Sequence, residues 1–168
     1  VTINCLSKIG EKIDLMTIPN ARLFLSIVET FNEQSSPDEN RFIDVIKKTV
    51  EVCKNKQLFV IWAQCRSTLL KTLQKFASKD EVRPEIAQTL SDTLQCYVEN
   101  DFLKKDENEQ SLAWNQAVVV SLNMLNKMED NLFNMCFDKS SDSLLKIIQA
   151  YSSEVRKQIS LAMQRRLL

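Results

Sequence analysis

Neighbouring carboxylates are the residues of this sequence with the clearest potential for chemistry, because two acids held close together can act as general acid and general base. Four such pairs occur: Asp38 with Glu39, Asp80 with Glu81, Glu99 with Asp101, and Glu129 with Asp130. Each pair lies near a predicted helix end or a break between helices, where acids cap the helix or stay solvated. We therefore interpret all four pairs as capping and surface residues, and we assign no catalytic residue.

Histidine does not occur in the 168 residues. Its absence removes the commonest general base, the usual activator of a Ser or Cys nucleophile, and the commonest transition-metal ligand. The single glycine, Gly10, cannot build a glycine-rich phosphate loop. The sequence therefore predicts that the chain is not an enzyme and holds neither a cofactor nor a metal ion.

Five cysteines are spread along the chain without a Cys-x-x-Cys pair: Cys5, Cys53, Cys65, Cys96 and Cys136. Their odd number, and the lack of any Asn-x-Ser/Thr sequence, favour reduced thiols in an intracellular protein of the cytoplasm or nucleus. A secreted, disulfide-linked helical protein is the alternative. Cys65 precedes Arg66, which raises the question of a reactive thiol, but it falls on an apolar helical stripe and is predicted to be a buried structural residue.

The segment at residues 57–73, QLFVIWAQCRSTLLKTL, contains an unbroken apolar run from Leu58 to Ala63. The run is much shorter than the roughly 18 residues that a membrane-spanning helix needs. Apolar residues then continue at helical spacing through Leu69, Leu73 and Phe76. The pattern therefore predicts a central helix that is buried on more than one side.

Six further segments show the same helical spacing of apolar residues. They run from Leu6 to Met16, Leu23 to Phe31, Ile43 to Cys53, Ile86 to Tyr97, Val118 to Cys136, and Leu144 to Ala162. Pro19 and Pro84 are expected in first turns, and Ser36 with Glu39 is expected to form a capping box. The breaks are expected at the polar stretches SKDEVRPE, KKDENEQ and DKSSDS.

About seven helices with short connections predict antiparallel neighbours in an all-α fold. Two architectures fit: an irregular α-α solenoid, HEAT- or armadillo-like in architecture, or a compact helical bundle. The length predicts one domain over residues 1–168. Because the sequence starts at Val1 and is still in helical rhythm at its last residue, we expect it to be a fragment of a longer chain.

The surface offers two kinds of candidate binding residue. Basic and acidic residues are equal in number overall, but residues 139–168 carry six basic residues against two acidic ones. The aromatic candidates are Phe102, which is either a hydrophobic staple onto the following helical hairpin or a docking residue, and Trp114, which is either a core residue or an exposed anchor. The candidate partner-binding residues are thus Phe102, Trp114, Arg156, Lys157, Arg165 and Arg166.

These observations favour a non-catalytic helical scaffold or adaptor domain that mediates protein–protein interaction within a larger intracellular protein. Its partner would be another protein, for which a helical peptide segment laid in a groove is one form of contact. The alternative is a nucleic-acid-associated helical domain that uses the basic C-terminal segment. No association with a membrane is expected, and the sequence does not determine an oligomeric state.

Overall fold

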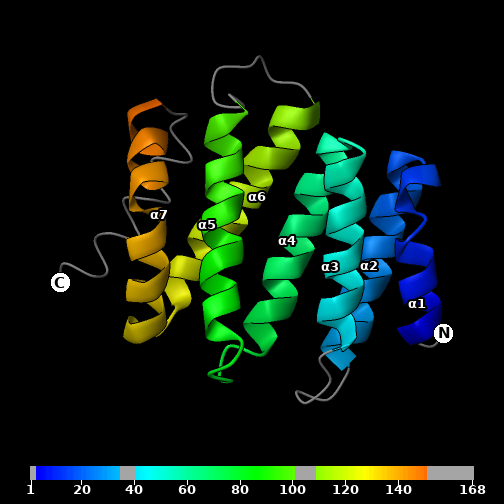
Figure 1. The fold of residues 1–168 in the computed structure, drawn as a ribbon, viewed down its shortest axis with the longest axis horizontal. Coiled ribbons are helices and arrows are strands. Elements are labelled where there is room, and N and C mark those ends of the chain that lie inside the picture. Colours follow the sequence, from blue (N-terminus) through cyan, green and yellow to red (C-terminus); the bar gives the residue numbers. More distant parts are fainter. Residues whose placement is uncertain (1–2, 35–40, 101–108, 151–168) are drawn as a thin grey trace. The chain divides into compact units, whose positions relative to one another are not determined.

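The computed structural model describes residues 3–34, 41–100 and 109–150 (Figure 1). These residues form seven α-helices and one 3-10 helix, and none of them lies in a β-strand. The all-α class that the sequence predicts is therefore confirmed. The predicted capping box at Ser36 and the predicted break around Asp106 lie outside the described residues.

The chain divides into two compact units, Val1–Phe76 and Ala77–Leu168. The described helices of the first unit are α1 (Ile3–Gly10), the 3-10 helix η1 (Ile13–Leu15), α2 (Ile18–Gln34), α3 (Arg41–Asn55) and α4 (Phe59–Lys75). Those of the second unit are α5 (Arg83–Glu99), α6 (Glu109–Lys127) and α7 (Asp130–Ala150). Whether these two units belong to one domain, as the sequence length predicts, is not tested by this division and stays a prediction.

In the first unit, α4 is the helix on which its neighbours pack. Both α2 and α3 lie against it, and α1 lies against α3 (Figure 1). Most residues of α4 are buried, including Trp62, Cys65 and Leu69, so the prediction of a central helix buried on more than one side is confirmed. Burial supplies most of the stability of this helix, and its helix propensity supplies less. The spacing of apolar residues from 58 to 76 reflects that burial and therefore identified the helix.

The predicted first helix is wrong in its C-terminal half. α1 ends at Gly10, and Ile13 lies in η1 rather than in a continuous helix to Met16. Gly10 is buried at the contact between α1 and α3: a Cβ atom placed there would lie 2.4 Å from Thr49 Oγ1. The chain's one glycine therefore lets two helices approach closely. The apolar spacing did not show where the helix ends, because Ile13 in η1 is also fully buried.

The connection between α3 and α4 is a Schellman motif built without glycine. The Leu58 N–H donates to the Cys53 carbonyl over 2.9 Å, and the Gln57 N–H donates to the Lys54 carbonyl over 3.1 Å. Gln57 adopts a φ of 55°, the left-handed conformation that this motif requires after the helix. The turn reverses the chain within three residues and places the end of α3 beside the start of α4.

In the second unit, α5 packs against α7 and, less extensively, against α6. The Tyr97 hydroxyl donates to Asn115 Oδ1 and so joins α5 to α6. The Ser91 hydroxyl donates to the Lys139 carbonyl over 2.9 Å, and Lys139 Nζ donates to Gln88 over 2.9 Å. Polar contacts thus join α5 to both of its neighbours.

The predicted break at DKSSDS is wrong, because residues 138–143 lie inside α7. The chain instead breaks at Met128 and Glu129, between α6 and α7. Ser140 is fully buried, and the Ser91–Lys139 contact shows that this stretch packs on α5. Tertiary packing therefore outweighs the weak helix propensity of Ser and Asp.

Five of the buried hydroxyl groups are paired within their own helices. Thr49, Ser67, Thr72, Thr93 and Ser121 each donate to the carbonyl four residues earlier, over 2.7–3.2 Å. This pairing lets small polar residues stand in the core without a lost hydrogen bond. It explains how the helical stripes tolerate so many Ser and Thr residues.

Helices two apart in sequence pack together in both units: α1 with α3, α2 with α4, and α5 with α7. Stacked helical arrays show this type of contact, and compact bundles are also compatible with it. Among the helices described, none combines the length and the apolar character needed to span a membrane.

Candidate docking site

Five of the six candidate residues predicted from the sequence lie outside the described residues: Phe102, Arg156, Lys157, Arg165 and Arg166. The sixth, Trp114, lies in α6 and its side chain is 0% exposed. This burial matches the core interpretation of Trp114 and leaves its indole ring no exposed surface with which to anchor a partner.

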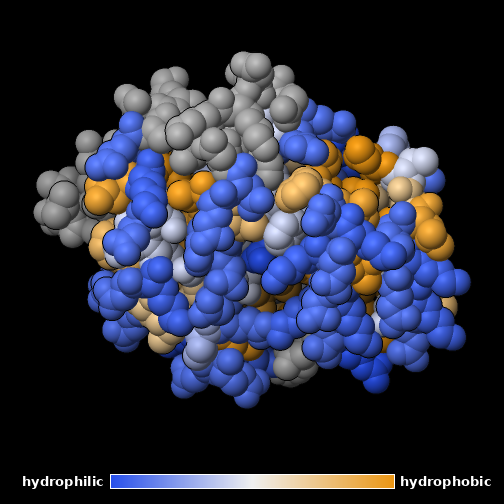
Figure 2. Space-filling model, turned by 45° about the horizontal axis from the view of Figure 1, so that its top comes forward, coloured by the Kyte–Doolittle hydropathy of each residue, from blue (hydrophilic) through white to orange (hydrophobic). Residues whose placement is uncertain are grey.

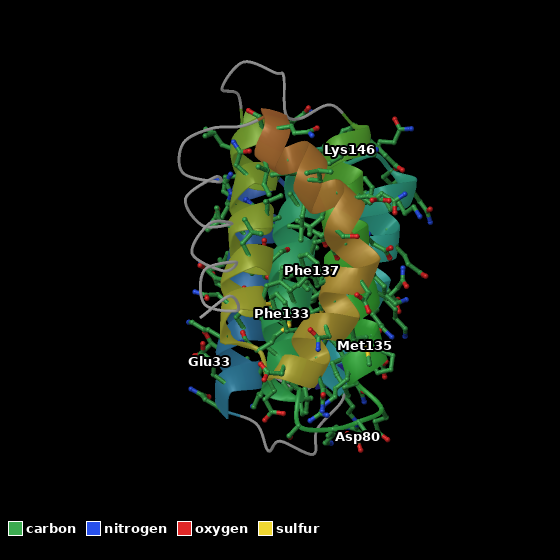
Figure 3. All side chains as sticks on the ribbon, turned by 90° about the vertical axis from the view of Figure 1, so that its left-hand side faces the viewer. Glu33, Asp80, Phe133, Met135, Phe137 and Lys146 are labelled. Atoms are coloured by element: carbon green, nitrogen blue, oxygen red, sulfur yellow. The ribbon has the colours of Figure 1, made fainter. Side chains whose placement is uncertain are left out.

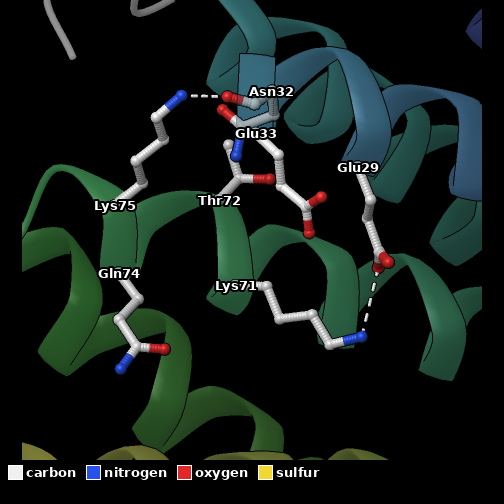
Figure 4. Close-up of a pocket in the computed structure, with 7 residues that line it drawn as sticks. All are labelled: Glu29, Asn32, Glu33, Lys71, Thr72, Gln74 and Lys75. Carbon is white, nitrogen blue, oxygen red and sulfur yellow. Dashed lines mark hydrogen bonds and ion pairs between the residues drawn. The ribbon is translucent and has the colours of Figure 1, made fainter. Parts of the chain in front are cut away.

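A hollow of about 410 Å³ opens between α2 and α4 of the first unit (Figure 4). The lining residues come from the C-terminal parts of both helices: Glu29, Asn32, Glu33, Lys71, Thr72, Gln74 and Lys75. Contacts at Glu29 and Asn32 reach successively later residues of α4, so the two helices run in the same direction here. Both helix C-termini therefore face the same end of the hollow.

Glu29 joins the two walls of the hollow. Its Oε1 accepts a hydrogen bond from the Thr68 hydroxyl over 2.8 Å and one from Lys71 Nζ over 3.3 Å. The side chains of Lys71 and Glu29 are 50% and 30% exposed, so solvent screens the ion pair and it contributes at most about 1 kcal/mol. The contact therefore positions α2 on α4 more than it stabilises the fold.

Lys75 closes one end of the hollow by donating from Nζ to the backbone carbonyl of Asn32. The last carbonyls of an α-helix have no partner within the helix, and a positive charge there also complements the helix dipole. Since α2 ends at Gln34, Lys75 acts as a side-chain cap for α2. Its positive charge is thereby directed to the helix end and away from the opening.

Two polar side chains at the hollow are available for a ligand. Glu33 and Gln74 are exposed, and neither has an ion pair or side-chain hydrogen bond to any described residue. In Figure 4 the Glu33 side chain points from α2 toward α4. The free carboxylate and the C-terminus of α4 together favour a positively charged group at this point.

The chemistry of the hollow suits binding. Its amide, hydroxyl, carboxylate and ammonium groups can hydrogen-bond a peptide, and its best-placed acid, Glu29, is already engaged by Thr68 and Lys71. In the described part of the chain, no group of three or more His, Cys, Asp or Glu residues is arranged to hold a metal ion.

Exposed apolar side chains are spread over both units. The first unit exposes Ile9, Leu15 and Leu23, and the second exposes Leu112, Met135 and Leu145. In Figure 2, hydrophilic side chains cover most of the visible face, with apolar surface at the end of the first unit where α1 and α2 lie. In the second unit, Phe133 and Phe137 stack on one side of α7 with ring centroids 5.7 Å apart, while Met135 lies on the other side (Figure 3).

Comparison of the chain with protein-family models, with curated proteins and with solved structures finds no match. Sequence reasoning missed the hollow because its two walls are about forty residues apart in the chain. One signal was present: Thr68, Lys71, Thr72 and Lys75 form a polar stripe at helical spacing along α4.

Proposed function

We propose that this chain is a non-catalytic helical scaffold or adaptor domain that binds another protein at the hollow between α2 and α4. The observation that carries the proposal is the unpaired Glu33 carboxylate at this hollow, whose lining also includes the exposed Gln74. Paired charges hold the walls in place, so the free groups are presented on a preformed surface. Such a surface offers contact and not reactivity.

The hollow favours a partner segment with a basic side chain. The Glu33 carboxylate and the C-terminal end of α4 attract positive charge, while Lys75 is engaged with the Asn32 carbonyl at the end of α2. Gln74 can both donate to and accept from a peptide amide. We therefore propose that a helical peptide segment with an exposed Lys or Arg docks here, in a cytoplasmic or nuclear setting.

The test is site-specific photocrosslinking with the whole chain. A photoreactive residue placed at Gln74 should capture a defined partner protein, and the same residue at Glu51, an exposed position on α3, should not. Adding Glu33→Lys should reduce the Gln74 crosslink at least about tenfold, because it places a positive charge against the partner's basic group. Glu51→Lys makes the same charge change away from the hollow and should leave the crosslink unchanged.

Two outcomes would contradict the proposal. The Gln74 probe would capture no protein that the Glu51 probe does not, or Glu33→Lys and Glu51→Lys would reduce the crosslink equally. Helix content, measured by circular dichroism, should be the same in both variants and serves as the control for folding.

A further inference from the structure

Cys53 and Cys65 form a thiol pair in the core of the first unit. Cys53 lies in the last turns of α3 and Cys65 lies on α4, and their Sγ atoms are 3.7 Å apart. Both side chains are 0% exposed. The two thiols are free and lie within hydrogen-bond distance of each other.

We propose that Cys53 and Cys65 are a redox-active dithiol site that a low-molecular-weight disulfide oxidises to a Cys53–Cys65 disulfide. A disulfide requires the sulfur atoms to close from 3.7 Å to about 2.05 Å, a movement that rotation of the two short side chains can supply. The bond would join α3 to α4, helices that already pack against each other. The site is independent of the hollow, so its test does not depend on the proposed function.

The reaction is balanced by a small disulfide of the oxidised glutathione type. The first protein thiolate attacks this disulfide, forms a mixed disulfide and releases one small thiolate. The second protein thiolate then attacks the protein sulfur of the mixed disulfide and releases the other small thiolate. The two protons of the protein thiols end on the two small thiols, so the protein pair is oxidised by two electrons and the small disulfide is reduced by two.

The local structure indicates which sulfur reacts first. The hydrogen bond to Cys53, burial, and the charge of Cys53 together raise the pKa of the Cys65 thiol well above its usual value. A raised pKa disfavours the Cys65 thiolate, which is the form that attacks a disulfide. Cys53 also lies nearer a helix end, where fraying gives a small oxidant access to a buried group.

The test treats the folded full-length chain with excess oxidised glutathione, blocks the remaining thiols by alkylation, and maps the peptides without reduction. We expect a linked peptide that contains Cys53 and Cys65 and that separates on reduction. Cys136→Ala removes another buried thiol and should leave the linked peptide unchanged. Cys53→Ala and Cys65→Ala should both abolish it, and circular dichroism checks that each variant is folded.

Oxidation should also raise the thermal unfolding midpoint of the chain by at least about 4 °C, because a crosslink constrains the unfolded state. Reduction should reverse the shift. Recovery of Cys53 and Cys65 as fully alkylated thiols would overturn the proposal, as would a disulfide that forms only above the urea midpoint of unfolding. A linked chain with an unchanged or lower midpoint would show that the bond distorts the native packing, and would overturn it too.

Discussion

At the residue scale, Gly10 shows how closely α1 and α3 approach each other. A Cβ atom at this position would lie 2.4 Å from Thr49 Oγ1 and 3.3 Å from Phe24 Cζ. Thr49 cannot easily move away, because it is fully buried, its hydroxyl donates to the Val45 carbonyl over 2.8 Å, and its branched side chain has few rotamers in a helix. The glycine is therefore needed for space.

We predict that Gly10→Ala lowers the free energy of unfolding by about 1–3 kcal/mol, because overpacking outweighs the better helix propensity of alanine. Adding Thr49→Ala removes the hydroxyl that the new methyl group meets. The double variant should therefore be less destabilised than the sum of the two single variants. Urea unfolding of the four proteins gives this coupling, and additive effects or a stabilised Gly10→Ala variant would contradict the prediction.

Gln57 is a second residue under a local constraint, since its φ of 55° lies where glycine is preferred. We predict that Gln57→Gly raises the free energy of unfolding by about 0.5–1 kcal/mol. Glycine removes the steric cost of a side chain in the left-handed conformation, and the larger entropy that glycine loses on folding offsets part of that gain. Asn55→Gly, at the last position of α3, is the matched control and should lower stability slightly. Equal effects from the two glycines in urea unfolding would exclude strain at Gln57.

At the element scale, the position of the break between α6 and α7 separates the sequence prediction from the structure. If DKSSDS were a connection, proline would be tolerated there. In the structure, Ser141 lies in the middle of α7, where proline removes a backbone hydrogen bond and clashes with the preceding turn.

We predict that Ser141→Pro lowers the free energy of unfolding by about 3 kcal/mol or more, with a loss of helical circular dichroism. Asn131→Pro is the matched control, because Asn131 is exposed and lies in the first turn of α7, where no N–H is needed for the helix. It should change stability by less than about 1 kcal/mol. Equal tolerance of the two prolines would place the break where the sequence analysis expected it.

The same comparison shows what the sequence could and could not predict. The α4 helix was predicted well because its apolar stripe is continuous and belongs to one element. The DKSSDS stretch was wrongly predicted to be a break, because the helicity of Ser140 depends on α5, a partner that periodicity does not reveal. The hollow and the Cys53–Cys65 pair depend on the packing of helices that are distant in sequence or reversed by a turn, so no local pattern could place their side chains together.

At the scale of the whole molecule, basic and acidic residues balance at 22 each. Long-range attraction of the entire chain to nucleic acid is therefore weak, and any such binding would depend on the basic residues after position 139. Docking at the hollow depends instead on a few local groups, chiefly the Glu33 carboxylate. These two modes of binding differ in how they respond to salt and to charge reversal.

We predict that changing Arg156, Lys157, Arg165 and Arg166 to Glu leaves the yield of the Gln74 photocrosslink within about twofold, since none of the four is among the described residues that line the hollow. The same yield should fall only a few-fold between 50 and 200 mM salt. A nucleic-acid domain with four phosphate contacts would lose about two orders of magnitude in affinity over this range, and the charge reversal would abolish its binding. Fluorescence anisotropy with a labelled DNA duplex measures that alternative directly. The nucleic-acid function would be favoured over the scaffold if duplex binding fell steeply with salt and if the charge reversal also abolished the protein crosslink.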